Sequence, residues 1–437
     1  MLYIKRLEIE NVRCFGTKQS VDFLNKKGKI AQWTVILGDN GSGKTTLLKS
    51  IVAMLPSPQN FLQKRSHLDT EYDLSIYTQW GKYWSLQRNQ QKKNSKLKLT
   101  IYETARPFIQ SKEGIPYDLL FEKNYNEPDE VYDHFYRPTL TTAVFSPVYC
   151  FAYGANRKVS PSSLSGNKLL EANETLFRDD AFLSSSEEFF LQMDYESAKS
   201  RRGSEQIDRI KTLLIKVLPK GIQDIRVAKT GPLLREVQVK TPYGWVNINE
   251  LSLGYKTTIA WLIDFASKMI YYHGHSTNPF AEPTILVIDE IDLHMHPAWQ
   301  YEIIENLTKL FPKTQFIVTA HSPLIVQTAL DANIVLLKRR SDHVEIISDP
   351  DTVKTWRVDQ ILTSDLFGVE NTRPKKIQKL LNERSKLLSK IELDEIDNNR
   401  LKEIEENLGE IPVYEDKYQR QAYSAIDKIA DLLRAKN

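Results

Sequence analysis

The sequence predicts an α/β fold in which a buried strand, a glycine-rich loop and a helix follow one another near the N-terminus. Trp33 to Leu37 is a short apolar run of the kind that forms a buried strand. It leads into the loop Gly38 to Thr45, after which apolar residues recur at helical spacing. Two further apolar runs end in polar residues: Ile285 to Ile288 precedes two acids, and Gln315 to Ala320 precedes a histidine. Such runs predict a parallel sheet with functional side chains at its carboxyl edge.

Composition is that of an ordinary globular protein with room for two or three domains, or one large domain with insertions. The 437 residues are 41% hydrophobic and 26% charged, and 59 basic against 56 acidic residues give a net charge of +3. This charge gives no sign of nucleic-acid binding. Cys14 and Cys150 lack disulfide or zinc spacing, and neither a signal peptide nor a membrane span is evident. We therefore expect a cytoplasmic location and no membrane partner.

The N-terminal region is predicted to be rich in strands. Met1 to Asn11 alternates apolar and polar residues, as a half-buried strand does. Residues 57–141 are expected to form an antiparallel β insertion, with strands at Tyr72 to Trp80, Lys82 to Gln87 and Leu97 to Tyr102. The tip of the insertion, Arg88 to Lys96, carries four basic residues and no acid. A solvated hairpin loop and a contact with phosphate backbone both fit that tip.

The middle of the chain changes from strand to helix. An apolar strand within Thr142 to Arg157 ends in YGANR, which fits either a nucleotide-sensing turn or an ordinary turn. Apolar residues then recur at helical spacing within residues 161–244, which predicts a helical subdomain with a flexible break from Ser197 to Ser204. A strand is expected from Asn333 to Lys338.

The expected organisation is a head over residues 1–375 and a helical C-terminal region over residues 376–437. Within the head, the nucleotide-binding core comprises residues 1–56, 142–160 and 245–345. The C-terminal region is predicted to form amphipathic helices. Packing onto the head and docking of an oligomeric or effector partner remain open for these helices.

The glycine loop has the G-x-x-x-x-G-K-[ST] pattern between a strand and a helix, which is typical of a phosphate-binding loop. Its glycines let backbone N–H groups converge on phosphates, and the helix that follows adds the positive end of its dipole. Lys44 is then a point charge for the β- and γ-phosphates, and the Thr45 hydroxyl is a natural Mg²⁺ ligand. The expected ATP-binding residues of the loop are Gly38, Asn40, Gly41, Ser42, Gly43, Lys44, Thr45 and Thr46.

The acids after the second apolar run predict catalytic roles. Asp289 is expected at the carboxyl end of a buried strand beside the glycine loop, where it can hold Mg²⁺. Glu290 is then the general base that accepts the proton of the attacking water, and His321 is placed near the γ-phosphate. A zinc site from His294 and His296 is not expected, because i, i+2 histidines do not share a helix face and no third ligand has metal spacing.

The order of these motifs resembles the ABC-type ATPases of the SMC, RecF and OLD branch. In that branch Gly38 to Thr46 corresponds to Walker A, and Asn11-Val12-Arg13-Cys14-Phe15 is similar to its opening Asn-x-Arg-x-Phe element. Ser252 and Gly254 in LSLGY resemble the signature motif, although the family pattern is LSGGQ and no Q-loop glutamine is evident.

The same resemblance implies a mixed-sheet ATPase head that binds ATP and Mg²⁺. Asn11 and Arg13 would contact ATP, and Ser252 and Gly254 would act in trans on the ATP of a second subunit. Asp292 and His294 lie in a segment that resembles the D-loop facing that subunit. A homodimer or higher homo-oligomer is therefore expected.

Three segments are similar to the stand-alone ATPases of bacterial antiphage systems, including the ATPase subunit of Septu and its retron-associated versions. They are YGANR, LSLGYKTTIAW and WRVDQILTSDLFG. This resemblance implies an ATP-hydrolysing defence subunit that controls a separate effector, often an HNH nuclease, and leaves contact with nucleic acid through that complex open.

Other classes of protein remain as alternatives. One is a DNA-repair or DNA-scanning ATPase of the SMC/RecF type, which acts on DNA directly, and another is an ATP-dependent clamp without turnover. The OLD-type nucleases place a TOPRIM domain after the ATPase, and Asp349-Pro350-Asp351 supplies an Asp-x-Asp pair. The chain after His321 leaves little room for that fold, so no nuclease domain is expected here.

Overall fold

A computed structural model describes the chain except at residues 1, 56–94, 104–114, 124–130, 137–148, 161–172, 184, 219–220, 232–234, 275, 349–355, 391–393 and 409–437. The chain divides into two compact units, Met1–Phe367 and Gly368–Asn437. Every residue predicted to bind nucleotide or metal lies in the first unit. Among the described helices, none combines the length and the apolar character that a membrane crossing needs.

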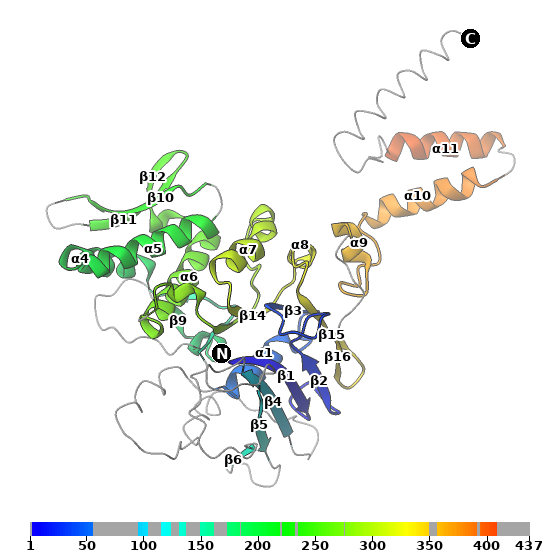
Figure 1. The fold of residues 1–437 in the computed structure, drawn as a ribbon. Coiled ribbons are helices and arrows are strands. Elements are labelled where there is room, and N and C mark those ends of the chain that lie inside the picture. Colours follow the sequence, from blue (N-terminus) through cyan, green and yellow to red (C-terminus); the bar gives the residue numbers. More distant parts are fainter. Residues whose placement is uncertain are drawn as a thin grey trace. The chain divides into compact units, whose positions relative to one another are not determined.

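Among the described residues, the central sheet of the first unit has six strands in the order β16-β15-β3-β14-β13-β7. Of these strands, Figure 1 labels β3, β14, β15 and β16. They are β3 (Trp33–Gly38), β7 (Cys150–Tyr153), β13 (Thr284–Ile288), β14 (Thr314–Thr319), β15 (Asn333–Arg339) and β16 (Val344–Ser348). All neighbours are parallel except β15 and β16. Every residue of β13 and β14 is buried, as in parallel strands that are covered on both faces. The structure thus confirms an α/β fold with a mixed sheet.

A second, antiparallel sheet contains the N-terminus and has the strand order β2-β1-β4-β5-β6. Its strands are β1 (Leu2–Glu10), β2 (Gln19–Asp22), β4 (Ser95–Glu103), β5 (Ile115–Lys123) and β6 (Val131–Tyr136). The expected strand Leu97 to Tyr102 lies within β4, so the region predicted as an insertion extends the sheet that β1 begins. The other two expected strands, and the basic tip except for its last two residues, lie outside the described residues.

Alternating residues of β13 divide the apolar core between the two faces of the central sheet. Ile285 and Val287 belong to the cluster that contains β1, β4 and the helix α1 (Lys44–Ala53). Leu286 and Ile288 belong to the cluster that contains the larger helices. Because the side-chain period of a strand is two, one buried strand serves both cores.

The larger helices cover the other face of the central sheet and carry a small sheet, β10-β11-β12. The elements on this face are α4 (Ser186–Lys199), α5 (Arg201–Val217), β10 (Asp224–Lys229), β11 (Arg235–Thr241), β12 (Gly244–Asn247), η3 (Ile248–Glu250), α6 (Leu253–Tyr272), η4 (Pro279–Ala281), α7 (Pro297–Leu310), α8 (Pro323–Thr328) and α9 (Val358–Thr363). The short helix α3 (Glu174–Phe177) instead belongs to the core that contains β1 and α1. The short strands β8 (Lys158–Val159) and β9 (Phe182–Leu183) pair in parallel.

The break predicted from Ser197 to Ser204 is confined to one residue. α4 ends at Lys199 and α5 begins at Arg201, and the Ser200 side chain accepts a hydrogen bond of 3.1 Å from the backbone N of Gly203. A serine at the N-cap satisfies one of the free N–H groups of a new helix. The predicted break is thus present at Ser200, and the polar residues on either side of it are helical.

The described part of the second unit contains two helices, α10 (Lys375–Leu388) and α11 (Glu395–Leu408). Arg400 pairs with Glu383 at 2.8 Å, and Arg384 pairs with Glu405 at 2.9 Å, so charged side chains link the two helices. Ile404 of α11 is fully buried. The apolar residues predicted to form a further helix, from Ile426 onward, lie outside the described residues.

Candidate active site

The glycine loop lies where the sequence predicts it, between the end of β3 and the start of α1. Gly43 is the N-cap of α1 with φ 87°, a backbone conformation that L side chains rarely adopt. A Cβ at this position would also overlap the sulfur of Cys14, which belongs to the turn after β1. The loop is therefore packed directly against the Asn-x-Arg-x-Phe segment. Within the loop, Asn40 is exposed and Ser42 is buried.

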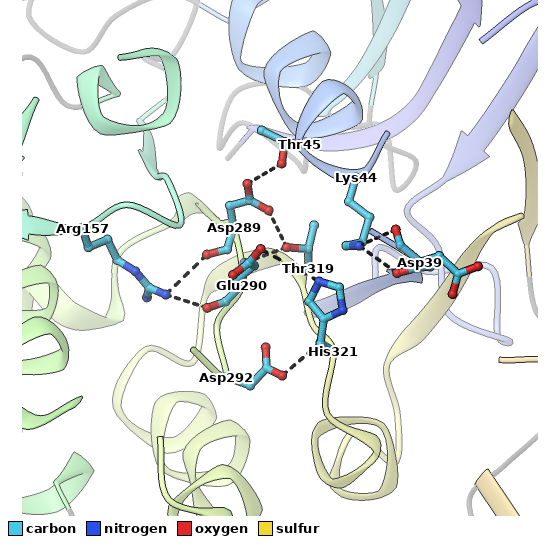
Figure 2. Close-up of polar contacts among 10 residues, drawn as sticks. Asp39, Lys44, Thr45, Arg157, Asp289, Glu290, Asp292, Thr319 and His321 are labelled. Atoms are coloured by element: carbon cyan, nitrogen blue, oxygen red, sulfur yellow. Dashed lines mark hydrogen bonds and ion pairs between the residues drawn. The ribbon is translucent and has the colours of Figure 1, made fainter. Parts of the chain in front are cut away.

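Lys44 is a buried cation that bends back over the loop. Its Nζ donates to the carbonyl oxygens of Gly38 at 2.7 Å and Asp39 at 3.0 Å (Figure 2). Burial lowers the pKa of Lys44, while the carboxylates of Asp289 and Glu290 act in the opposite direction. Phosphate oxygens are stronger acceptors for an ammonium group than neutral carbonyls, so the side chain is placed to exchange these partners for a nucleotide.

Thr45 and Asp289 meet at the expected magnesium site. The Thr45 hydroxyl donates to Oδ2 of Asp289 at 2.6 Å, and the hydroxyl of Thr319 donates to Oδ1 at 2.6 Å (Figure 2). Asp289 is 3% exposed and directly follows β13, while Thr45 lies in the first turn of α1. Mg²⁺ usually takes one or two protein oxygens and keeps several waters. This hydroxyl and carboxylate pair fits that requirement.

Glu290 and His321 face each other beside this pair. The Nε2 of His321 lies 3.9 Å from Oε1 of Glu290, and the two side chains are 39% and 32% exposed. Glu290 has φ 52°, which is uncommon for a residue with a side chain. Its backbone N donates to the Thr319 hydroxyl at 2.7 Å. A partly exposed carboxylate next to a buried one is suited to accept a proton from water, and the role of Glu290 as the base stays a prediction.

The segment after Glu290 makes contacts within the chain. Asp292 is 8% exposed, and its Oδ2 accepts a hydrogen bond of 2.9 Å from the backbone N of His321. His294 is exposed with φ 63°. His296 is the N-cap of α7, where its Nδ1 accepts from the backbone N of Ala298 at 3.2 Å. Contact of Asp292 and His294 with a second subunit stays a prediction.

Asn11 and Arg13 lie in the turn between β1 and β2, and both have positive φ, 53° and 47°. The backbone N of Asn11 donates to the Gly16 carbonyl at 2.8 Å, and Ser95 of β4 donates to the Asn11 carbonyl at 2.6 Å. Burial lowers the pKa of Arg13, which is next to Cys14. The turn meets the glycine loop through Cys14 and Phe15, and contact of Asn11 and Arg13 with ATP stays a prediction.

The signature segment begins α6. Ser252 is the N-cap residue and is exposed, and its hydroxyl makes no capping hydrogen bond. Leu253 is 55% exposed, whereas Gly254 is buried against the backbone carbonyl of His294, which a Cβ would overlap. The serine is therefore presented to solvent, while the glycine has a packing role within the chain. Action of both residues in trans stays a prediction.

Two residues of the site were not predicted from the sequence. Thr319 ends β14 and contacts both acids that follow β13. Arg157 follows β7, is 5% exposed, and its Nη2 donates to the carbonyl oxygens of Glu290 at 2.5 Å and Asp289 at 3.4 Å (Figure 2). The arginine of YGANR was a visible signal, but nothing in the sequence shows that β7 is the neighbour of β13.

Known proteins resemble this chain to different extents. The Septu protein PtuA of Bacillus mycoides (strain KBAB4) is 25% identical over 432 residues, which are 97% of this chain and 53% of that protein. The retron Ec83 probable ATPase of Escherichia coli is 37% identical over 144 residues, which are 33% of this chain and 26% of that protein. The chain thus spans about half the length of the first relative and a quarter of the second.

These matches confirm the predicted resemblance to the Septu and retron ATPases. Among solved structures, an SMC head bound to the C-terminal winged-helix domain of ScpA aligns with 79% of this chain and 97% of its own, at 19% identity and a TM-score of 0.44. Residues 33–327, more than half of the chain, match one protein family. The chain therefore belongs to the family described as AAA domain, putative AbiEii toxin, Type IV TA system.

Proposed function

We propose that this chain binds and hydrolyses ATP as a subunit of an antiphage defence system, and that its nucleotide state controls a separate effector. The observation that carries the proposal is the convergence of Thr45, Asp289, Glu290 and His321 beside the glycine loop. These side chains come from the first turn of α1 and from the carboxyl ends of β13 and β14. Ligands of α/β sheets bind at this edge, and the chemistry of the residues matches phosphoryl transfer to water.

Each residue has a distinct part in the proposed reaction. Lys44 and the backbone N–H groups of the loop hold the β- and γ-phosphates. Thr45 and Asp289 would hold Mg²⁺, which neutralises charge on the phosphate oxygens when bound. Glu290 accepts the proton of the attacking water, and His321, 3.9 Å from it, donates a hydrogen bond to the γ-phosphate.

The defence role is supported by the relatives rather than by the site. The names of the two relatives assign one to the Septu system and the other to a retron. The likeness to the Septu protein extends over 97% of this chain, beyond the segments that form the ATP site. We propose that the effector is a separate protein such as an HNH nuclease.

The exposed serine at the start of α6 supports a dimer. Ser252 leaves its hydroxyl and the N-terminus of α6 available, and a helix N-terminus favours bound phosphate. We propose that this surface completes the ATP site of a second copy, so that ATP holds two subunits together and hydrolysis releases them.

Glu290→Gln tests the proposal because it removes the general base and keeps the size and hydrogen-bonding capacity of the side chain. We expect kcat for ATP hydrolysis to fall about 100-fold or more, because general-base catalysis contributes on that scale. ATP should still bind, and the ATP-bound variant should accumulate as a dimer in light scattering. Steady-state phosphate release and equilibrium binding of ATP measure the two effects.

The matched control is Glu305→Gln, on the exposed surface of α7, where the glutamate pairs with Lys309. We expect its kcat to stay within about twofold of the wild-type value, as for most surface substitutions. Normal turnover by Glu290→Gln would contradict the assignment of the base. In cells that carry the chain with its neighbouring genes, phage plaque counts that are unchanged by Glu290→Gln would contradict the defence role.

A further inference from the structure

We propose that Arg157 is a positioning residue that fixes the backbone of Glu290, so that its carboxylate is held where the attacking water must be deprotonated. This inference rests on the proposed ATP hydrolysis with Glu290 as the base. It concerns a residue that bonds to the backbone of the base and therefore acts through another residue.

The conformation of Glu290 requires external support. Its φ of 52° places a residue with a side chain in the left-handed region, which such residues enter at a cost. A backbone in this state persists when its surroundings hold it from more than one side. The left-handed turn is also useful, because it directs the Glu290 carboxylate towards His321 while the preceding Asp289 carboxylate faces Thr45.

Hydrogen bonds hold Glu290 from both neighbouring strands. On the β14 side, the hydroxyl of Thr319 accepts from the backbone N of Glu290 at 2.7 Å. On the β7 side, the guanidinium of Arg157 donates to the backbone O of Glu290 at 2.5 Å and of Asp289 at 3.4 Å. Since β13 lies between β14 and β7, Thr319 and Arg157 bond to the backbone of the turn from opposite sides (Figure 2).

Arg157 is itself well fixed. The turn that carries it closes with a hydrogen bond of 2.9 Å from its backbone N to the Ala155 carbonyl, and Asn156 donates to the Asp179 carbonyl at 3.1 Å. At the base of the turn, the Tyr153 hydroxyl donates to Asp264 of α6 at 2.5 Å. The guanidinium is thus presented by a segment that is bound to the rest of the unit on two sides.

The charge of Arg157 fits this task. Burial lowers the pKa of Arg157 to about 10, against the opposing effect of Asp289, Asp292 and Glu290, so the group remains protonated near neutral pH. A buried cation is costly unless it is compensated. Here the compensation comes from carbonyl oxygens and nearby carboxylates. Both carbonyls accept from the same nitrogen, Nη2, which the planar guanidinium holds in a fixed direction, whereas the ammonium of a lysine is a point charge on a flexible stem.

The consequence for catalysis is specific. A displacement of about 1 Å of a catalytic group can cost about 100-fold in rate. Arg157 contacts the backbone of the base, whereas Lys44 and the loop hold the phosphates. Loss of Arg157 should therefore lower kcat and leave ATP affinity nearly unchanged. If Arg157 only attached its own turn to the sheet, its loss would lower the stability of the protein but would not lower kcat while KM stays nearly unchanged.

The experiment compares Arg157→Gln and Arg157→Lys with the wild-type chain. We expect Arg157→Gln to lower kcat about 10- to 100-fold, with KM within about threefold of wild type. Arg157→Lys keeps the charge but loses the rigid planar guanidinium, so an intermediate kcat is expected. In the Glu290→Gln background, Arg157→Gln should change the residual rate by less than about twofold, because residues that act as a unit are not additive.

The control is Arg235→Gln on β11, where the arginine is half exposed and pairs with Asp194. A wild-type kcat in Arg157→Gln would overturn the proposal, and so would a raised KM with unchanged kcat in either variant. An equal loss in the wild-type and Glu290→Gln backgrounds would also overturn it. Should Arg157→Gln fail to fold, as judged by its circular dichroism and melting curve, the same criteria apply to Arg157→Lys. Wild-type turnover by Glu290→Gln alone would overturn the proposed function and this inference together.

Discussion

At the scale of single residues, Thr319 shows how one side chain orders the candidate active site. Its hydroxyl accepts from the backbone N of Glu290 and donates to Oδ1 of Asp289, and Thr319 itself is fully buried. The Asp289 carboxylate is left with Oδ2 facing Thr45. One hydroxyl therefore sets the orientation of the metal-binding acid and the backbone of the proposed base.

We predict that Thr319→Val, which keeps the shape of the side chain, destabilises the protein by about 1–3 kcal/mol, because a buried N–H loses its partner. The kcat for ATP should fall as well, since both acids lose an anchor. Thermal unfolding and steady-state kinetics measure these effects. Thr319→Ser, which keeps the hydroxyl, should retain most of the activity. A Val variant with wild-type kcat would show that this anchor is dispensable.

Sequence reasoning found the residues whose roles follow from local spacing. Lys44 and Thr45 are fixed by the glycine pattern, and Asp289 and Glu290 by their place after an apolar run. Thr319 and Arg157 could not be found in this way. Arg157 meets Glu290 across 133 residues, and the contact depends on β7 being the neighbour of β13, which is a property of strand order.

At the scale of elements, the start of α6 is packed against the turn that follows β13. Gly254 lies against the carbonyl of His294, so the helix and the turn approach through backbone atoms. The sequence predicts both segments but not their contact, because 40 residues separate them and nothing local encodes it. The same limit applies to the β insertion, where the strand from Leu97 to Tyr102 was expected but its addition to the sheet of β1 was not.

Gly254→Ala should disturb this contact. Its Cβ would overlap a backbone oxygen, which cannot rotate away, so we expect a loss of about 1–3 kcal/mol in stability, as in overpacked cores. The exposed Ser252 should be displaced with the helix, and ATP-dependent dimerisation should weaken. The melting temperature of Gly254→Ala measures the loss of stability. Light scattering with ATP, with Gly254→Ala placed in the Glu290→Gln background, measures dimerisation.

The control on the same helix is Lys256→Ala, where the side chain is only partly buried and donates to the Asn249 carbonyl. Its effect on stability should stay within about 0.5 kcal/mol. If the Gly254→Ala protein melts and dimerises like the wild type, the turn that contains His294 can move to accommodate the added Cβ without loss of stability.

At the scale of the whole molecule, the candidate site and the C-terminal helices belong to different units. All the residues discussed for ATP, from Asn11 to His321, lie in Met1–Phe367. The sequence places the end of the head at residue 375, whereas the first unit ends at Phe367. Gly368, which begins the second unit, has φ 62°, a conformation suited to a sharp change of chain direction.

Truncation after Phe367 tests whether the first unit suffices for catalysis and assembly. A compact unit with its own core should fold alone, so we expect the truncated chain to hydrolyse ATP within about twofold of the full chain. With Glu290→Gln and ATP it should still dimerise, because Ser252 and the glycine loop remain. A folded but inactive truncated chain would show that the second unit takes part in the site.

Co-purification of the full and truncated chains with the proposed effector then tests the role of α10 and α11. Loss of the effector only on truncation favours docking on these helices. Retention of the effector by the truncated chain places the docking surface on the ATPase unit.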